Sequence, residues 1–206
     1  MPVSLAPVKE IIPGLWHWTA FHEGIGMDVS SYLVERAAAL IDPMLPEQGV
    51  EAFRGREPEV ILLTNRHHYR HSERFAEEFG CPVLCHEAGL HEFEGGPPVQ
   101  GFAFGDDVAY GVLALEVGVL TPEETAFHVD TDPGALSFGD AVVNIPDGGL
   151  AFVPDEYIGD DPEAIKEGLR ESFRRLLAHD FDALLIAHGE PMPGGGKAAL
   201  QRFAAG

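Results

Sequence analysis

The sequence predicts an α/β fold in which two β-sheets face each other and helices cover their outer sides. Short apolar strands bounded by glycine, proline and aspartate occur along most of the chain, and in the middle they alternate with helical segments. A long amphipathic helix appears only near the C-terminal end. Two sheets that bury one face on each other and the other face under helices account for this order most simply.

The composition predicts one well-filled domain over residues 1–206. The chain is 45% hydrophobic and 23% charged, which is typical of a globular protein. Its formal net charge is −21 and would remain −11 with all 10 histidines protonated. We therefore expect a small-molecule ligand and neither nucleic acid nor a membrane surface as partner. The N-terminus lacks a secretory signal, so we expect a cytoplasmic protein.

The first part of the chain predicts two hairpins joined by a glycine-containing loop over residues 21–28. Pro13-Gly14 marks the first turn, and the second hairpin ends at Asp42-Pro43. The predicted strands cover residues 8–12, 15–20, 30–34 and 37–41.

The middle of the chain predicts a locally parallel sheet because strands and helices alternate there. Gly80 stands where a helix would end. The predicted elements are a helix over 47–54, a strand over 59–63, a helix over 69–79, a strand over 81–85 and a helical segment over 87–93. Cys81 and Cys85 are too far apart along such a strand to form a disulfide with each other.

The last part predicts a second set of strands and two helices. A glycine- and proline-rich segment over 94–110 should form a loop and an edge strand, and residues 144–161 a polar connection. Asp161 and Pro162 are typical of a helix start, and apolar residues follow at helical spacing to Leu177. The predicted strands cover 112–120, 126–130, 134–138, 141–143 and 183–187, and a final helix covers 197–203.

Polar residues follow three of the predicted strands. Residues 65–71 contain three histidines, Asp140 follows the strand over 134–138, and His188 follows the strand over 183–187. If these strand ends converge, imidazole and carboxylate groups would suit zinc, iron or manganese, and a bound ion would acidify a water for hydrolysis. The alternative is a set of polar strand-end residues without a metal.

Several segments, in this order, resemble the metallo-β-lactamase superfamily, including glyoxalase II-like hydrolases. Residues 63–70 occupy the place of the family motif Thr-His-x-His-x-Asp-His. The other segments that carry the resemblance are Ile12-Pro13-Gly14-Leu15-Trp16, Ser31-Tyr32-Leu33-Val34, Ala39-Leu40-Ile41-Asp42, Thr121-Pro122-Glu123-Glu124, Phe138-Gly139-Asp140 and Ala187-His188-Gly189. The resemblance implies a four-layer αββα sandwich with its site along one edge.

The motif departs from the family pattern at four of its seven ligand positions. His67, Asp140 and His188 are retained, whereas the replaced positions are Asn65, Tyr69, Arg70 and Glu124. The resemblance implies at most one firmly held ion, bound by His67, Glu124 and Asp140 with His188 as a further contact. Arg70 would repel a second ion beside Asp140.

The same resemblance suggests roles for the neighbouring residues. Tyr69, Arg70 and His188 are the expected catalytic groups, and Asn65, His68 and His71 are expected to line the substrate site. A shifted metal site is the alternative: if the segment were helical, His67 and His71 would share a face and could ligate an ion with Asp140 and His188.

Two functional hypotheses follow. The first is a divergent hydrolase with one zinc, iron or manganese ion, acting on a thioester, lactone or phosphoester. The second is a metal-free binding or regulatory protein in which Arg70 contacts Asp140 and takes the place of the metal charge.

Overall fold

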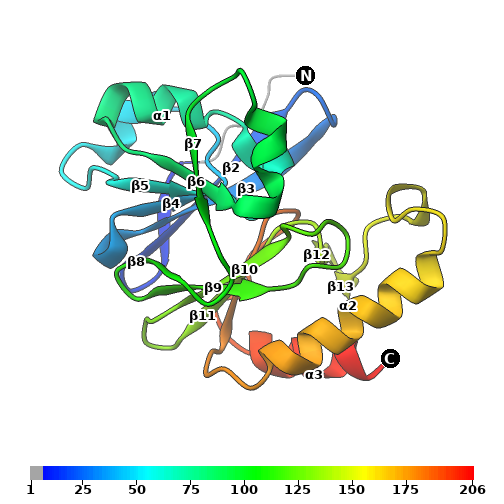
Figure 1. The fold of residues 1–206 in the computed structure, drawn as a ribbon. Coiled ribbons are helices and arrows are strands. Elements are labelled where there is room, and N and C mark those ends of the chain that lie inside the picture. Colours follow the sequence, from blue (N-terminus) through cyan, green and yellow to red (C-terminus); the bar gives the residue numbers. More distant parts are fainter. Residues whose placement is uncertain (1–6) are drawn as a thin grey trace.

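The chain forms two facing β-sheets with helices on the outer side of each, and the computed structural model describes residues 7–206 (Figure 1). The first sheet has seven strands that lie in the order of the sequence. They are β1 (Lys9–Ile12), β2 (Leu15–His22), β3 (Met27–Val34), β4 (Ala39–Ile41), β5 (Val60–Leu62), β6 (Val83–His86) and β7 (Val99–Phe102).

The second sheet has five strands in the order β14-β11-β10-β9-β8. They are β8 (Asp107–Ala109), β9 (Val112–Glu116), β10 (Thr125–Val129), β11 (Ala135–Phe138) and β14 (Ala183–Ile186). A separate hairpin consists of β12 (Val143–Ile145) and β13 (Gly149–Ala151).

Three α-helices and five short 3-10 helices complete the described residues. The α-helices are α1 (Ser72–Phe79), α2 (Pro162–Leu176) and α3 (Gly196–Ala205). The 3-10 helices are η1 (Glu35–Ala37), η2 (Gly49–Phe53), η3 (Arg66–Tyr69), η4 (Glu87–Phe93) and η5 (Asp155–Tyr157). Figure 1 shows α1 beside the first sheet, and α2 and α3 together on the opposite side of the molecule.

An apolar core lies between each pair of adjacent layers, which confirms the predicted αββα sandwich. Residues of both sheets, such as Tyr32 and Phe127, fill the space between the sheets. Phe75 of α1 packs with Trp18 and Phe53 on the outer face of the first sheet. A third core joins α2 and α3 to the outer face of the second sheet. Burying an aromatic side chain of this kind contributes roughly 1.5–3 kcal/mol.

The predicted parallel region and the predicted long helix are confirmed. Strands β4, β5, β6 and β7 pair in parallel, because α1 and the 3-10 helices carry the chain back between them. Helix α2 starts as expected: the side chain of Asp161 accepts a hydrogen bond from the backbone N of Ala164 at 3.2 Å, and Pro162 occupies the first turn. Leu169, Phe173 and Leu176 are its buried face.

Several predicted boundaries were wrong, and one of the errors lies next to the site. The helix predicted from residue 69 begins at Ser72, because Arg70 has a φ of 46° and interrupts the chain between η3 and α1. The predicted loop over 21–28 is shorter, since β2 continues through His22 and β3 starts at Met27.

The two irregular segments contain more structure than predicted. Residues 94–110 supply β7 and β8, which are edge strands of two different sheets. The connection over 144–161 includes β13 and η5, and the helix predicted over 47–54 is the 3-10 helix η2. Short elements of this kind carry too few periodic residues to be distinguished from loops.

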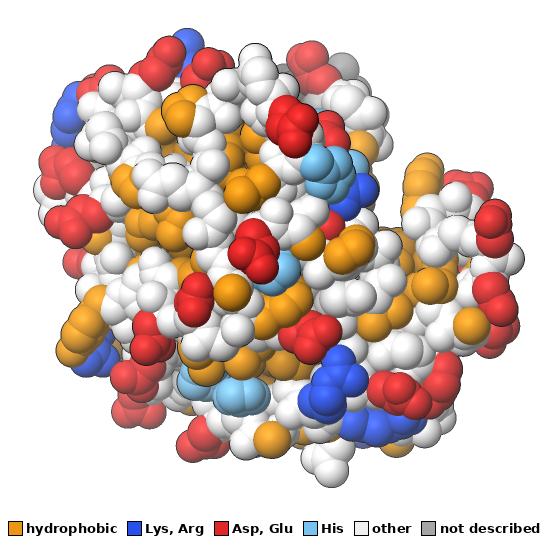
Figure 2. Space-filling view, in the orientation of Figure 1, with side chains coloured by type: hydrophobic (Ala, Val, Ile, Leu, Met, Phe, Trp, Pro, Cys, Tyr) orange, Lys and Arg blue, Asp and Glu red, His pale blue; other side chains and the backbone are white. Residues whose placement is uncertain are grey.

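Cys81 and Cys85 are buried free thiols. No helix within residues 7–206 is both long enough and apolar enough to cross a bilayer. Figure 2 shows acidic side chains spread over the visible face, whereas the largest basic group lies in the region of α2 and α3.

Candidate functional site

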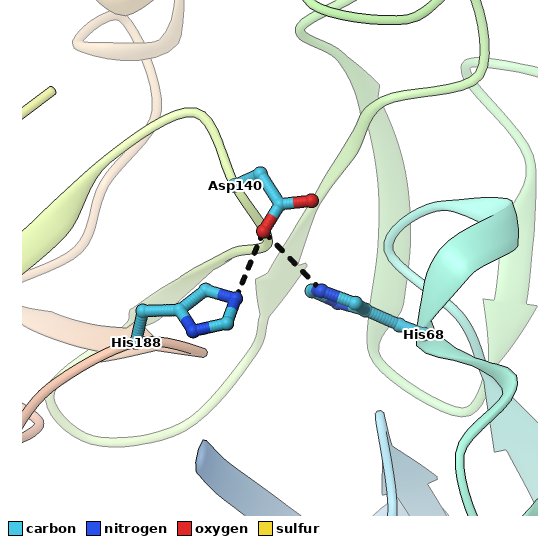
Figure 3. A group of neighbouring side chains, drawn as sticks. All are labelled: His68, Asp140 and His188. Atoms are coloured by element: carbon cyan, nitrogen blue, oxygen red, sulfur yellow. Dashed lines mark ion pairs between the residues drawn. The ribbon is translucent and has the colours of Figure 1, made fainter. Parts of the chain in front are cut away.

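Three residues from different strand ends converge, as the sequence predicted for their regions. Asp140 follows β11, His188 follows β14, and His68 lies in η3 just after β5. Oδ1 of Asp140 is 2.9 Å from Nε2 of His188 and 3.3 Å from Nε2 of His68. Figure 3 shows the rings of His68 and His188 directed at the same carboxylate oxygen of Asp140. These ligand atoms all lie within 4.8 Å of one another, so the three residues are a candidate metal-binding group.

Asp42 holds the other side of the His68 ring. Its Oδ2 is 2.9 Å from Nδ1 of His68, and both residues are buried. Thr64 fixes the same carboxylate, because its backbone N donates to Oδ1 at 2.9 Å and its Oγ1 donates to Oδ2 at 2.6 Å. The parallel pairing of β4 with β5 places the two strand ends side by side. His68 therefore has a carboxylate at each ring nitrogen.

The charges in this group stabilise one another. Burial and the Arg70 cation oppose protonation of His68, but Asp140 and Asp42 outweigh them and raise its pKa to about 9. Burial also opposes ionisation of Asp140, yet His68 and His188 hold its pKa well below the usual range. In the absence of a metal, the group is an imidazolium flanked by two carboxylates.

Glu124 is a neighbour of Asp140, and both of its carboxyl oxygens accept hydrogen bonds. Its Oε1 accepts from the backbone N of Asp140 at 2.8 Å and of Ala141 at 3.2 Å. The Asn65 side-chain amide donates to Glu124 Oε2 at 3.0 Å and to Asp140 Oδ2 at 2.9 Å. Burial and the Asp140 charge raise the pKa of Glu124 to about 8. Asn65 and Glu124 thus form a hydrogen-bonded support for Asp140.

Gly139 permits this close packing. A Cβ at this position would lie 2.5 Å from Thr64 Oγ1, 2.9 Å from Glu124 Oε1 and 3.1 Å from Asn65 Nδ2. No other residue type would leave these three polar groups in place.

Arg70 is close to the group but does not contact Asp140 directly. Its Nη1 donates to the backbone O of Ser30 at 2.9 Å and of Asp42 at 2.8 Å. The carboxylate of Asp140 has His68 and His188 as its ion-pair partners among the described residues. The Arg70–Asp140 contact expected for a metal-free protein is therefore replaced by two histidine contacts.

His67 and Tyr69 lie on the other side of η3. His67 is exposed, and both residues line a surface cleft of about 420 Å³. The cleft is lined by Arg66, His67, Tyr69, Glu73, Glu92, Phe93 and Pro97. His67 lies on this side of η3 because of Asn65. The Oδ1 of Asn65 accepts a hydrogen bond from the backbone N of His67 at 2.9 Å, and this hydrogen bond sets the direction of η3. The structure consequently brings His68, rather than the expected His67, to Asp140.

His71 is also outside the group. Its Nδ1 accepts a hydrogen bond from the backbone N of Leu45 at 3.0 Å, and it precedes α1. The turn at Arg70 separates it from η3, so His67 and His71 do not share a helical face. The shifted site that required this shared face does not form.

The sequence interpretation missed Asp42 and Thr64. A signal for Asp42 was present, since Ile41-Asp42-Pro43 places a carboxylate at a strand end as Phe138-Gly139-Asp140 does. Thr64 also follows a buried strand and matches the first residue of the family motif, but neither feature indicated its hydrogen bonds to Asp42.

Solved structures share this arrangement of strands and helices. A metallo-β-lactamase from Erythrobacter litoralis, with β-mercaptoethanol in its active site, matches 100% of this chain and 97% of its own, with a TM-score of 0.68 and 16% identity. The chain has the metallo-β-lactamase fold. This fold confirms the resemblance seen in the sequence.

Two other solved structures share this fold. A protein crystallised in a di-iron-bound form is 25% identical, with a TM-score of 0.64, over 82% of this chain and 92% of its own. A class B3 metallo-β-lactamase with an active-site glutamic acid is 17% identical, with a TM-score of 0.63, over 97% of this chain and 86% of its own. No protein-family model matches the sequence, and neither does any curated protein.

Proposed function

We propose that this metallo-β-lactamase-fold protein is a hydrolase that binds a single transition-metal ion at His68, Asp140 and His188. The observation that carries the proposal is the convergence of two imidazole nitrogens and one carboxylate oxygen within 4.8 Å. Two histidines and a carboxylate are a common ligand set of catalytic zinc sites, and they also suit iron and manganese. This set differs from the one that the family ligand positions imply, because His68 does not occupy a family ligand position.

The surroundings of these three residues fit one ion. Asp42 contacts Nδ1 of His68 at 2.9 Å and leaves Nε2 directed at Asp140, an arrangement that commonly orients a metal-binding histidine. The side chain of Asp140 is 30% exposed, so solvent and a small molecule can reach the group from its side.

The same surroundings do not fit a second ion. The amide of Asn65 presents hydrogens to Glu124 and Asp140, and hydrogens cannot ligate a cation. Glu124 is held by two backbone amides, and the half-buried Arg70 guanidinium adds a positive charge nearby. One neighbour of known structure has an active-site glutamic acid, but Glu124 here is a support for Asp140. The usual two-metal arrangement is therefore not proposed.

A bound ion would supply a Lewis acid and an acidified water for attack on a carbonyl or phosphoryl centre. Within the chain, Asp42 orients His68, and Glu124 and Asn65 fix Asp140, whose exposed carboxylate edge faces an incoming substrate. The fold suggests a thioester, lactone or phosphoester as substrate. Arg70, one of the expected catalytic groups, acts here by holding the backbone at Ser30 and Asp42.

Metal analysis and a hydrolysis screen test this proposal together. Protein purified without a metal-affinity tag is incubated with zinc, iron or manganese, desalted, and assayed for metal and for hydrolysis of one thioester, one lactone and one phosphoester. We expect about one equivalent of metal and hydrolysis of at least one substrate that is lost in His188→Ala. Metal below about a tenth of an equivalent with all three ions rejects the proposal.

A metal-free binding protein is the second candidate, and one observation favours it. Both ring nitrogens of His68 already face carboxylates, and the half-buried Arg70 guanidinium donates to the backbone O of Asp42. The cations of the chain can thus balance Asp42 and Asp140 without an ion. A metal-free preparation that binds a small molecule and loses binding in Asp140→Ala supports this candidate.

A further inference from the structure

We propose that Ser30 and Ser31, adjacent residues of β3, are positioning residues that set His188 and His68 against Asp140. The proposal rests on the proposed function only because it takes these two histidines as the functional residues of the site. Successive side chains of a strand point to opposite faces, so two neighbouring serines can act on two different segments. Here Ser30 points toward the second sheet, whereas Ser31 points toward the turn after β4.

Ser30 holds the chain on both sides of His188. Its backbone N donates to the O of Ala187 at 2.8 Å, and its Oγ donates to the O of Gly189 at 2.9 Å. Tyr32, two residues along the same face, donates to the O of Ile186 at 2.8 Å. Three carbonyls around His188 are therefore bound by β3 of the opposite sheet.

His17 of β2 contacts the hydroxyl of Ser30. Its Nε2 is 2.9 Å from Ser30 Oγ, and its ring stacks on Tyr32 with 5.1 Å between ring centroids. His17 is 2% exposed and Ser30 is 1% exposed. The hydroxyl of Ser30 consequently has a partner on each side and one defined orientation.

Ser31 holds the residue that orients His68. Its Oγ donates to the O of Asp42 at 2.8 Å and accepts from the backbone N of Met44 at 2.9 Å. Asp42 has a φ of 48°, a left-handed conformation that is costly for a residue other than glycine. These two hydrogen bonds stabilise that turn, and the turn directs the Asp42 carboxylate at His68.

Arg70 links Ser30 to the turn that Ser31 holds. One nitrogen, Nη1, donates to the O of Ser30 and to the O of Asp42, so it ties the Ser30 backbone to the turn that Ser31 stabilises. The two serines, bridged in this way, fix the separation of the His68 and His188 rings, whose centroids lie 5.6 Å apart. A structural role in the strand alone would not require both serines to contact the site segments.

Imidazole NMR of the metal-free protein tests the proposal. Ser30→Ala should shift the ring signals of His188 more than those of His68, and Ser31→Ala should do the reverse. The NOE between the two rings should weaken in both variants. Each variant loses only the two hydrogen bonds of one hydroxyl, so both variants should remain folded. Ser30→Thr, which keeps the hydroxyl, should retain the wild-type His188 signals.

Ser172→Ala is the matched control. Ser172 of α2 is also buried, and its Oγ donates to the O of Val117 at 2.9 Å rather than to a segment that carries His68 or His188. Its removal should lower stability to a similar degree without moving either histidine signal. The proposal is overturned if Ser30→Ala and Ser31→Ala leave both histidines unchanged, or shift them in the same proportion as each other.

Metal affinity separates this proposal from the proposed function. If the wild-type protein binds an ion, Ser30→Ala and Ser31→Ala should each weaken binding by about tenfold, because they loosen the residues behind the ligands. If the wild-type protein binds none, the proposed function fails, while the NMR comparison still decides whether the serines position the histidines.

Discussion

Asp42 and His68 form a buried ion pair, with 2.9 Å between Oδ2 and Nδ1, although they come from the ends of two different strands. Asp42→Asn keeps the shape of the side chain and tolerates the φ of 48°. It removes the negative charge, so the pKa of His68 should fall from about 9 toward its ordinary value. The unfolding free energy at neutral pH should drop by roughly 3–5 kcal/mol.

Urea denaturation and NMR titration of His68 measure these two effects. Asp147→Asn is a suitable control, because Asp147 has a φ of 60° but is exposed. Its effect should stay within about 0.5 kcal/mol. Equal effects of the two substitutions would show that the Asp42 charge is unimportant.

The stability of the metal-free protein should fall as pH rises from about 6.5 to about 9. A histidine whose pKa is raised on folding contributes stability that is complete below its unfolded pKa and lost through its folded pKa. For His68 these values are 6.5 and about 9, which corresponds to roughly 3 kcal/mol. Glu124 acts in the same direction, because its pKa is raised to about 8.

The decisive quantity is the difference between wild type and His68→Gln, measured by urea denaturation across this pH range. The variant should lose the part of the slope of unfolding free energy against pH that comes from His68. His128→Gln, a substitution in β10, should keep it. Identical slopes for wild type and His68→Gln would refute the charged state assigned to His68.

Gly139→Ala should disrupt the support of Asp140. The added Cβ would lie 2.5 Å from Thr64 Oγ1 and 2.9 Å from Glu124 Oε1, so at least one hydrogen-bonding group must move. We expect a loss of about 2–4 kcal/mol in thermal or chemical denaturation. Gly194→Ala is the control, since the nearest atom there lies 3.5 Å away and the residue is exposed. A wild-type stability of Gly139→Ala would contradict the packing described here.

Asn65→Asp should destabilise the protein increasingly as pH rises. It replaces the amide that donates to Glu124 and Asp140 with a third carboxylate beside them. Like charges at this separation repel, so the effect should be small near pH 4 and large near pH 8. Asn144→Asp, whose amide donates to the O of Glu190, should show little pH dependence. Equal pH profiles for both variants would contradict the role given to Asn65.

The sequence was sufficient for most of the fold because its apolar patterns are long and regular. Helix α2 has a cap at Asp161, a proline in its first turn and an apolar face that repeats every three or four residues. The positions of Asp140 and His188 near strand ends were also predicted correctly, since each lies two residues after a buried strand.

The detail of the site could not be read from the sequence in the same way. Whether His67 or His68 faces Asp140 depends on a rotation of η3, which is set by the Asn65 cap and by the φ of 46° at Arg70. Neither feature leaves a periodic pattern. The partnership of Asp42 with His68 depends on the parallel pairing of β4 and β5, which is a tertiary contact.

Metal titration of four proteins tests the central claim most directly: wild type, His67→Ala, His68→Ala and His188→Ala, each purified without a metal-affinity tag. We predict about one equivalent of bound zinc, iron or manganese in wild type and in His67→Ala, and a large loss in His68→Ala and His188→Ala. Two equivalents in wild type, or loss of the ion in His67→Ala with retention in His68→Ala, would contradict the single site at His68, Asp140 and His188.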